Sequence, residues 1–118
     1  MITFVTGNVF ITDSCIRKLA NELFYIGNCP ESKQKLRAEM LITENDRNPV
    51  VFSYSAVPLL VFRVAVRQGK LSTTDLKILF FKERGKNPIE LQTDTDGRIS
   101  EWPDGFFDTT RRLLAELL

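Results

Sequence analysis

The chain has 118 residues, a formal net charge of +1 and no histidine. At this length it can bury a core large enough for one domain, and its 43% hydrophobic and 26% charged residues are typical of a globular protein. The small net charge excludes a general attraction to nucleic acid, and the lack of histidine removes the commonest general base and metal ligand.

The termini and the cysteines predict a cytoplasmic protein. Met1 is followed by no basic stretch and no small-residue cleavage site, so we expect no signal peptide. The longest apolar run, 56–66, is too short for a membrane span and contains Arg63. Cys15 and Cys29 stand apart, in neither a redox nor a zinc pattern, which is typical of a reducing compartment. We therefore expect no membrane contact, no metal and no cofactor.

The N-terminal residues predict two short strands and a helix. Residues 2–5 and 9–12 are β-branched and aromatic, and the Gly7 turn between them is compatible with a hairpin. Asp13 can then cap a helix that ends at Gly27. The apolar residues at helical spacing in this segment are Ile16, Leu19, Ala20, Leu23 and Phe24.

A second helix and a buried strand are predicted next. The helix fits residues 31–43 after Pro30, and the apolar residues it is expected to bury are Leu36, Met40 and Leu41. A polar loop over 44–49 follows. The run Val-Val-Phe at 50–52 predicts a short buried strand.

A third helix is predicted over residues 55–68. Ser55 can cap it, Pro58 is tolerated in its first turn, and Gly69 is suited to end it. Its apolar residues nearly encircle the helix axis, so we expect it to be covered on several sides.

The last part of the chain predicts an antiparallel meander and a terminal helix. Residues 76–82 and 89–93 are expected to pair as a hairpin, and the Asp-Gly turn at 96–97 leads to a third strand over 98–102. A helix begins at Asp108 or Thr109. Its apolar residues are Leu113, Leu114, Leu117 and Leu118. The predicted fold class is mixed α and β, of the α+β kind, and Phe80 and Phe81 are expected to face opposite sides of their strand.

Three sequence blocks in the second half of the chain are distinctive. They are V-V-F-S-Y-S at 50–55, R-x-x-V-R-Q-G-K-L-S-x-x-D at 63–75 and D-G-R-I-S-E-W-P-D-G-F-F-D at 96–108. Together they resemble a C-terminal domain of uncharacterised function in bacterial predicted ABC/SMC-like ATPases, which are related to the RecF and OLD ATPases and some of which serve in phage defence. The segment from residue 30 is similar more weakly. The resemblance divides the chain into an N-terminal segment, 1–49, and an ATPase C-terminal-like domain, 50–118.

The catalytic positions that this resemblance implies are all altered. The chain contains no Walker A loop: Gly69-Lys70-Leu71-Ser72 lacks the upstream glycine and follows a predicted helix, where a phosphate-binding loop follows a strand. Tyr54 stands at the place of the family's switch histidine and Phe52 at the acid before it. A phenol with a pKa near 10 cannot do the same proton or charge work at neutral pH. The resemblance therefore implies a degenerate lobe without enzyme activity.

The remaining candidate residues suggest contacts. The candidates for an interaction surface are Leu60, Phe62, Arg63, Arg67, Trp102, Phe106 and Phe107. The aromatic residues among them can instead plug the core. A small lobe has too few elements to cover an apolar helix all round, and an uncovered apolar patch usually marks an interface with another protein or a second copy.

Our leading hypothesis is a non-catalytic interaction or regulatory module, a small subunit that acts with an ATPase or effector in phage defence. One alternative is a nucleic-acid-binding accessory protein, because residues 63–86 carry seven basic and two acidic residues. The acidic stretch 87–108 can neutralise that charge across a hairpin. Another alternative is one half of a split ATPase. A hydrolase that uses Asp94/Asp96 or Asp104/Asp108 is disfavoured, because turns favour aspartate for backbone reasons alone.

Overall fold

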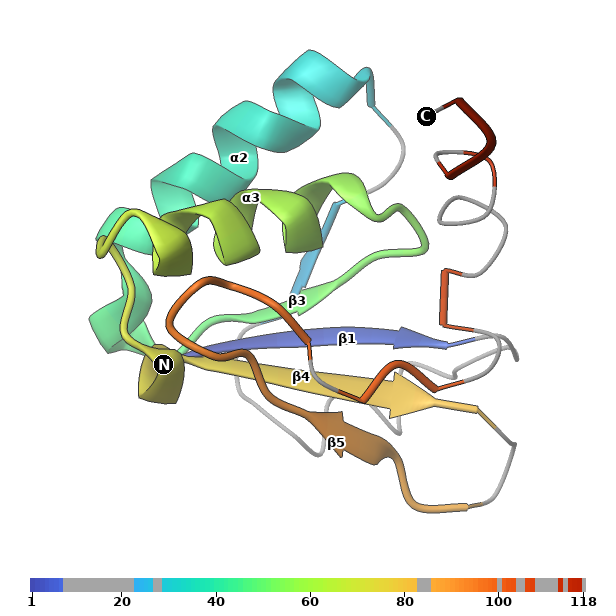
Figure 1. Cartoon of the computed structure of the whole chain (residues 1–118). Helices are drawn as coiled ribbons and strands as arrows, with labels where there is room; N and C mark the ends of the chain where they lie inside the picture. The colour runs from blue at the N-terminus through green and yellow to red at the C-terminus, as the bar shows by residue number, and fades with distance from the viewer. Residues whose placement is uncertain are drawn as a thin grey trace.

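A computed structural model describes residues 1–7, 23–26, 29–82, 86–99, 101–103, 106–107, 113 and 115–117. The described strands form one five-stranded sheet, in the order β2 (Leu23–Tyr25), β3 (Val50–Phe52), β1 (Ile2–Gly7), β4 (Leu76–Phe81) and β5 (Ile89–Leu91). The first four strands of that order are parallel, and β5 is antiparallel to β4 (Figure 1). The fold is therefore mixed α and β, as predicted.

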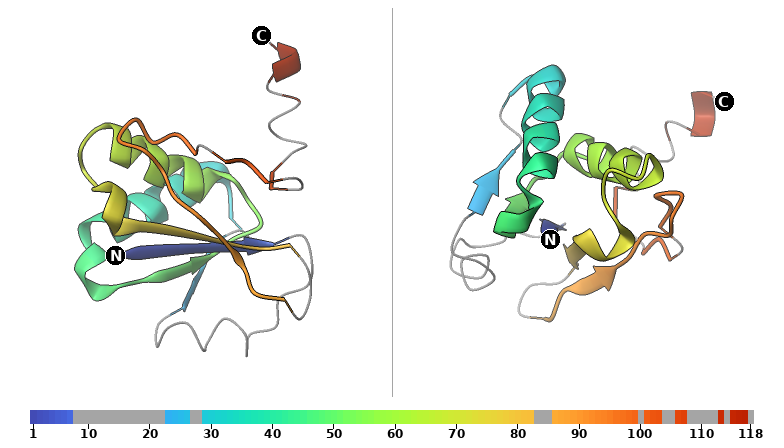
Figure 2. Two further views of the ribbon diagram at one scale, coloured as in Figure 1. Left: turned by 60° about the horizontal axis from the view of Figure 1, so that its bottom comes forward. Right: turned by 90° about the vertical axis from the view of Figure 1, so that its left-hand side faces the viewer.

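Two α-helices, α2 (Glu31–Thr43) and α3 (Val57–Arg67), lie side by side on one face of this sheet (Figure 2). Each helix connects two parallel strands, α2 between β2 and β3 and α3 between β3 and β4. Parallel strands need such crossovers, because the chain must return to the same end of the sheet. Two 3-10 turns, η1 (Asn45–Arg47) and η2 (Thr73–Asp75), precede β3 and β4.

The main core lies between the sheet and the two helices. Its largest fully buried aromatic side chains are Phe4, Phe62, Phe80 and Phe106. A second buried cluster on the other face of the sheet consists of Val5, Val50, Phe52 and Leu79, with Phe81 packed against it. Phe80 and Phe81 thus face opposite sides of β4, as the alternation of a strand requires. Residues from both 1–49 and 50–118 contribute to the sheet and its main core.

The predicted limits of α3 are confirmed within two residues. The Ser55 hydroxyl accepts a hydrogen bond from the Val57 N–H (3.2 Å), and Pro58 lies in the first turn. At the other end Gly69 has a φ of 77°. The N–H groups of Gly69 and Lys70 donate to the carbonyls of Val66 (3.1 Å) and Ala65 (2.9 Å). This pair of hydrogen bonds is the Schellman motif. The motif requires a residue in the left-handed conformation, and glycine adopts that conformation at little cost.

The predicted structure of the N-terminal segment is wrong in two places. β1 pairs with β3 on one side and with β4 on the other, so its edges leave no place for the predicted hairpin. Leu23 and Phe24 belong to β2 and not to a helix. Three apolar residues in a row are compatible with either a helix or a strand. Here the pairing of these residues with β3 makes them a strand. Residues 9–12 and the remaining residues of that predicted helix (Ile16, Leu19 and Ala20) lie outside the described part of the chain.

The predicted limits of α2 and the burial of Leu41 are confirmed, but the predicted burial of Leu36 and Met40 is wrong. Leu36 and Met40 are 60% and 58% exposed, whereas Gln34, Ala38 and Leu41 face the core. The Nε2 group of Gln34 donates a hydrogen bond to the Cys29 carbonyl (2.8 Å), whereas its Oε1 is buried and has no hydrogen-bond partner among the described residues.

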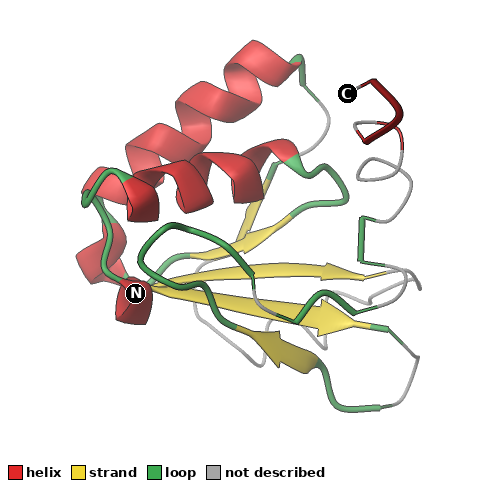
Figure 3. Ribbon diagram, viewed as in Figure 1, coloured by secondary structure: helices red, strands yellow, loops and turns green. Residues whose placement is uncertain are grey.

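The C-terminal part contains less regular structure than predicted. The hairpin of β4 and β5 is confirmed. The prediction of a third strand is wrong. Only one bridge is described there, between Thr93 and Ile99, because the chain leaves the sheet and turns toward α3 (Figure 3). The described residues 113 and 115–117 are helical, and Leu113 and Leu117 are exposed. None of the helices in the described ranges is long and apolar enough to cross a membrane.

Candidate protein-interaction surface

The two sides of α3 have different neighbours. We call the side that meets residues 94–99 and 101–103 the closed flank, and the side that faces α2 the open flank. Arg63 lies on the closed flank, where it contacts Gly97 and Trp102. Leu60 and Val64 lie on the open flank, beside a groove between the two helices. The candidate site is this open flank.

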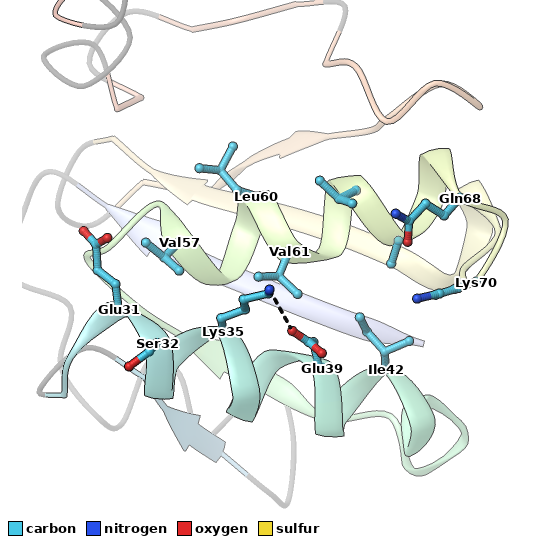
Figure 4. Close-up of a pocket in the computed structure, with 12 residues that line it drawn as sticks. Glu31, Ser32, Lys35, Glu39, Ile42, Val57, Leu60, Val61, Gln68 and Lys70 are labelled. Carbon is cyan, nitrogen blue, oxygen red and sulfur yellow. Dashed lines mark ion pairs between the residues drawn. The ribbon is translucent and has the colours of Figure 1, made fainter.

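The α2–α3 groove has a volume of about 530 Å³ (Figure 4). Its lining residues are Val57, Leu60, Val61, Val64, Ala65 and Gln68 from α3 and the residue after it, Glu31, Ser32, Lys35, Glu39 and Ile42 from α2, and Lys70. Most of the α3 residues are apolar, whereas α2 contributes mainly polar and charged ones. The groove therefore has one apolar wall and one charged wall.

Part of the apolar wall is exposed to solvent. Leu60 and Val64 lie one helical turn apart and are 43% and 50% exposed. The exposed apolar residues of α2, Leu36 and Met40, are not among the residues that line the groove. Val61 and Ile42 pack against the main core beneath. Leu60 and Val64 thus form the exposed part of an apolar surface that continues into the core.

Charged side chains run along the groove with alternating sign. Figure 4 shows Glu31 at one end, Lys70 at the other, and Lys35 and Glu39 between them. Lys35 Nζ lies 3.8 Å from Glu39 Oε1, with the two side chains 69% and 49% exposed. Solvent screens such a pair, so it contributes at most about 0.5 kcal/mol. A ligand can therefore displace this pair at little cost.

Arg63 contacts the segment after β5 on the closed flank. Arg63 Nε donates a hydrogen bond to the Gly97 carbonyl (2.8 Å), and the guanidinium carbon lies 5.4 Å from the centre of the Trp102 ring. Burial lowers the pKa of Arg63, and the carboxylate of Asp94 partly offsets this effect. The guanidinium still keeps its charge at neutral pH. Arg63 therefore joins α3 to the segment after β5.

Gly97 approaches α3 so closely that no other residue fits. Its φ is 75°, and a Cβ at this position would lie 2.2 Å from the Arg63 carbonyl oxygen. Asp94 shapes the same turn, because its Oδ1 accepts hydrogen bonds from the N–H groups of Asp96 (2.9 Å) and Arg98 (3.0 Å). This backbone role explains Asp94 without catalysis, whereas Asp104 and Asp108 lie outside the described residues.

The aromatic candidates belong mainly to the core. Phe106 is fully buried, and its ring centre lies 5.2 Å from that of Phe80 and 5.1 Å from that of Trp102. Trp102 and Phe107 are partly buried, and the Trp102 Nε1–H donates to the Phe106 carbonyl (2.6 Å). The core-plug interpretation is confirmed for Phe106. Phe62 is also fully buried, so a partner cannot reach either Phe106 or Phe62. The prediction that these two residues belong to an interaction surface is therefore wrong.

Two further candidates, Tyr54 and Arg67, are exposed. Tyr54 follows β3, and its ring packs edge-on against Phe52 with centres 4.8 Å apart. Arg67 lies one turn after Arg63 on α3. Among the residues that the structure describes, no three cysteine, aspartate or glutamate side chains gather as a metal site.

The basic stretch 63–86 does not form one surface in the described part of the chain. Arg63 lies on the closed flank and Lys70 at the end of the groove. Lys77 lies on β4 between residues of the main core, so it points to the other face of the sheet. This separation gives no support to the nucleic-acid hypothesis.

The α2 wall of the groove was not among the residues predicted from the sequence. The sequence does contain an indication of this charged wall, because Lys35 and Glu39 are opposite charges four residues apart on one helix face. Which neighbour this face meets depends on the order of β2, β3 and β4, which no local pattern reveals.

Comparison with known families covers only the C-terminal part of the chain. A family model described as "Protein of unknown function (DUF3696)" matches residues 71–117. The match includes β4, β5 and the Trp102–Phe107 block but not α3 or the groove. No curated protein and no solved structure matches the chain. The match therefore supports the resemblance in its third block, while the relation to ATPases stays a prediction.

Proposed function

We propose that this chain is a non-catalytic protein-interaction module and that its partner binds in the α2–α3 groove. The observation that carries the proposal is the exposure of Leu60 and Val64 beside that groove. Single exposed leucines are common on protein surfaces, but two apolar residues on successive turns, continuous with the core, form a patch of the kind that marks interfaces.

The shape and charge of the groove define the partner's chemistry. Two adjacent helices leave a groove that accepts a helical face with apolar residues one turn apart. The four charges along the groove sum to zero, so neither a strongly acidic nor a strongly basic partner is favoured. We therefore propose a protein helix whose apolar ridge contacts Leu60 and Val64.

The setting of this module follows from the sequence resemblance. We propose that it acts in the bacterial cytoplasm with an ABC-type ATPase or its effector, in a process such as phage defence. The substitutions at Tyr54 and Phe52 and the absence of a phosphate-binding loop in these 118 residues support a role without ATP hydrolysis. Calorimetry of the purified chain with Mg-ATP tests this part. We expect no binding, and micromolar affinity would overturn the non-catalytic proposal.

The interface proposal is tested by two leucine substitutions on neighbouring helices. Leu60→Glu places a charge in the groove, whereas Leu36→Glu makes the same change on an exposed part of α2 outside it. We expect Leu60→Glu to abolish the association of the chain with its protein partner, and Leu36→Glu to leave it unchanged. Light scattering on the purified chain and quantitative co-purification from the source cells measure that association. Equal behaviour of the two variants in both assays would contradict the proposal.

A further inference from the structure

The order of charges along the α2–α3 groove carries information about the partner. From one end to the other the charged residues are Glu31, Lys35, Glu39 and Lys70, so the signs run negative, positive, negative, positive (Figure 4). When this order is reversed, every position has the opposite sign. The groove is therefore complementary to an antiparallel copy of itself.

We infer that the partner in the groove is a second copy of this chain, related by a two-fold axis; this inference rests on the proposed function of the groove. The axis passes between Lys35 and Glu39, perpendicular to the groove. It places Glu31 opposite Lys70 of the second copy, and Lys35 opposite Glu39 of the second copy. An isologous interface needs such self-complementarity, because the same patch is used on both sides.

The apolar residues fit the same arrangement. Leu60 and Val64 line the α3 wall of the groove, and Figure 4 shows Leu60 between the charged ends, Glu31 and Lys70. The two-fold axis brings them against the same two residues of the second copy, which removes both pairs from water. The charged pairs then lie along one edge of the apolar contact, where they add to the polar rim that most protein interfaces have. An unrelated partner would place no such condition on the order of charges.

The area of the surface formed by α2 and α3 limits the affinity of the dimer. Helices of 13 and 11 residues provide a face about 20 Å long, and doubling it buries on the order of 1,000 Å². This area is at the lower limit of specific interfaces, so we expect a dissociation constant in the micromolar range. The oligomeric state must therefore be measured over a range of protein concentrations.

Charge reversal at the two ends of the groove tests the arrangement. Glu31 and Lys70 are exposed, so Glu31→Lys and Lys70→Glu leave the core intact. Each variant alone faces like charges across the two-fold axis, and we expect its dimerisation to weaken on the order of tenfold. An equal mixture of the two variants places opposite charges at both ends, so it should form a heterodimer as readily as the wild type dimerises. Lys33→Glu, a charge reversal on α2 outside the groove, is the matched control.

Light scattering and native mass spectrometry distinguish the outcomes. Preferential heterodimer formation, lost when Leu60→Glu is added to both chains, would support the inference. A wild-type chain that stays monomeric at all concentrations would overturn the second copy as partner, while the comparison of Leu60→Glu with Leu36→Glu in cells still tests the groove. A wild-type dimer that ignores Leu60→Glu and both charge reversals would overturn the inference and the proposed function together.

Discussion

The closed and open flanks of α3 differ in how far neighbouring segments cover them. The helix is apolar on nearly all sides, and on its closed flank Arg63 contacts Gly97 and Trp102 of the segment after β5. On its open flank Leu60 and Val64 face a groove whose other wall is charged. The comparison shows that the exposure of an apolar helix depends on what its neighbours contribute and not on its own composition. It also separates residues that stabilise the fold from residues available to a partner.

The largest expected effect comes from the aromatic core of the closed flank. Phe106→Ala removes a fully buried ring that contacts Phe80 and Trp102, so we expect a loss of about 3–5 kcal/mol in the free energy of unfolding. Urea denaturation measures it. A loss below about 1 kcal/mol would show that the segment is not part of the core.

A pair of glycine substitutions isolates the close contact between the turn and α3. Gly97 and Gly69 both have φ near +75°, but a Cβ at Gly69 meets no atom within 4 Å, whereas at Gly97 it meets the Arg63 carbonyl oxygen. We expect Gly69→Ala to cost about 1 kcal/mol from backbone strain alone, and Gly97→Ala about 2–4 kcal/mol because the helix must also move. Thermal and urea denaturation of both variants test this difference. Equal costs would mean that the turn does not press against α3.

An intermediate effect is expected from the arginine on the closed flank. Arg63→Met removes the hydrogen bond to the buried Gly97 carbonyl and the contact over Trp102, which should cost about 1–2 kcal/mol. Arg67→Met changes an exposed arginine one turn later and should stay within about 0.5 kcal/mol of the wild type. Denaturation of the two variants side by side measures the contrast. If both cost the same, Arg63 does not hold the segment.

The smallest effect on stability is expected on the open flank. Leu60→Ala should change the free energy of unfolding by less than about 1 kcal/mol, whereas Leu59→Ala, at a fully buried neighbouring position, should cost about 2–5 kcal/mol. The free energy of unfolding should be measured at a protein concentration too low for association, because dimerisation would add stability by mass action. A large loss for Leu60→Ala in the monomer would place Leu60 in the core and remove it from the interface.

The confirmed predictions depended on local chemistry. Pro30 and the residues after it predicted α2 with its observed limits, and Ser55 and Gly69 predicted the ends of α3. The Asp-Gly turn before Arg98 was visible for the same reason, because only certain residues adopt a left-handed conformation cheaply. Such signals act over three or four residues, so a single sequence displays them fully.

The wrong predictions depended on contacts between distant segments. β1 is a central strand because it pairs with β3 and β4, which begin 48 and 74 residues after it in the chain. Leu23 and Phe24 are a strand only because β3 lies beside them. Leu36 and Met40 face outward because the sheet meets α2 on the side of Ala38. No local periodicity contains this information, since each choice is made by a partner elsewhere in the chain.

The residues alone were enough to predict a mixed α and β protein without a phosphate-binding loop or histidine, and with one helix too apolar to be stable in isolation. Which side of that helix packs against the core depends on the packing of the whole chain. Trp102 reaches the closed flank because Gly97 lets the chain pass close to α3, whereas α2 presents Lys35 and Glu39 to the open flank. The reason is geometric: local sequence sets the pattern on each helix, but the packing of helices and sheet sets which patterns meet.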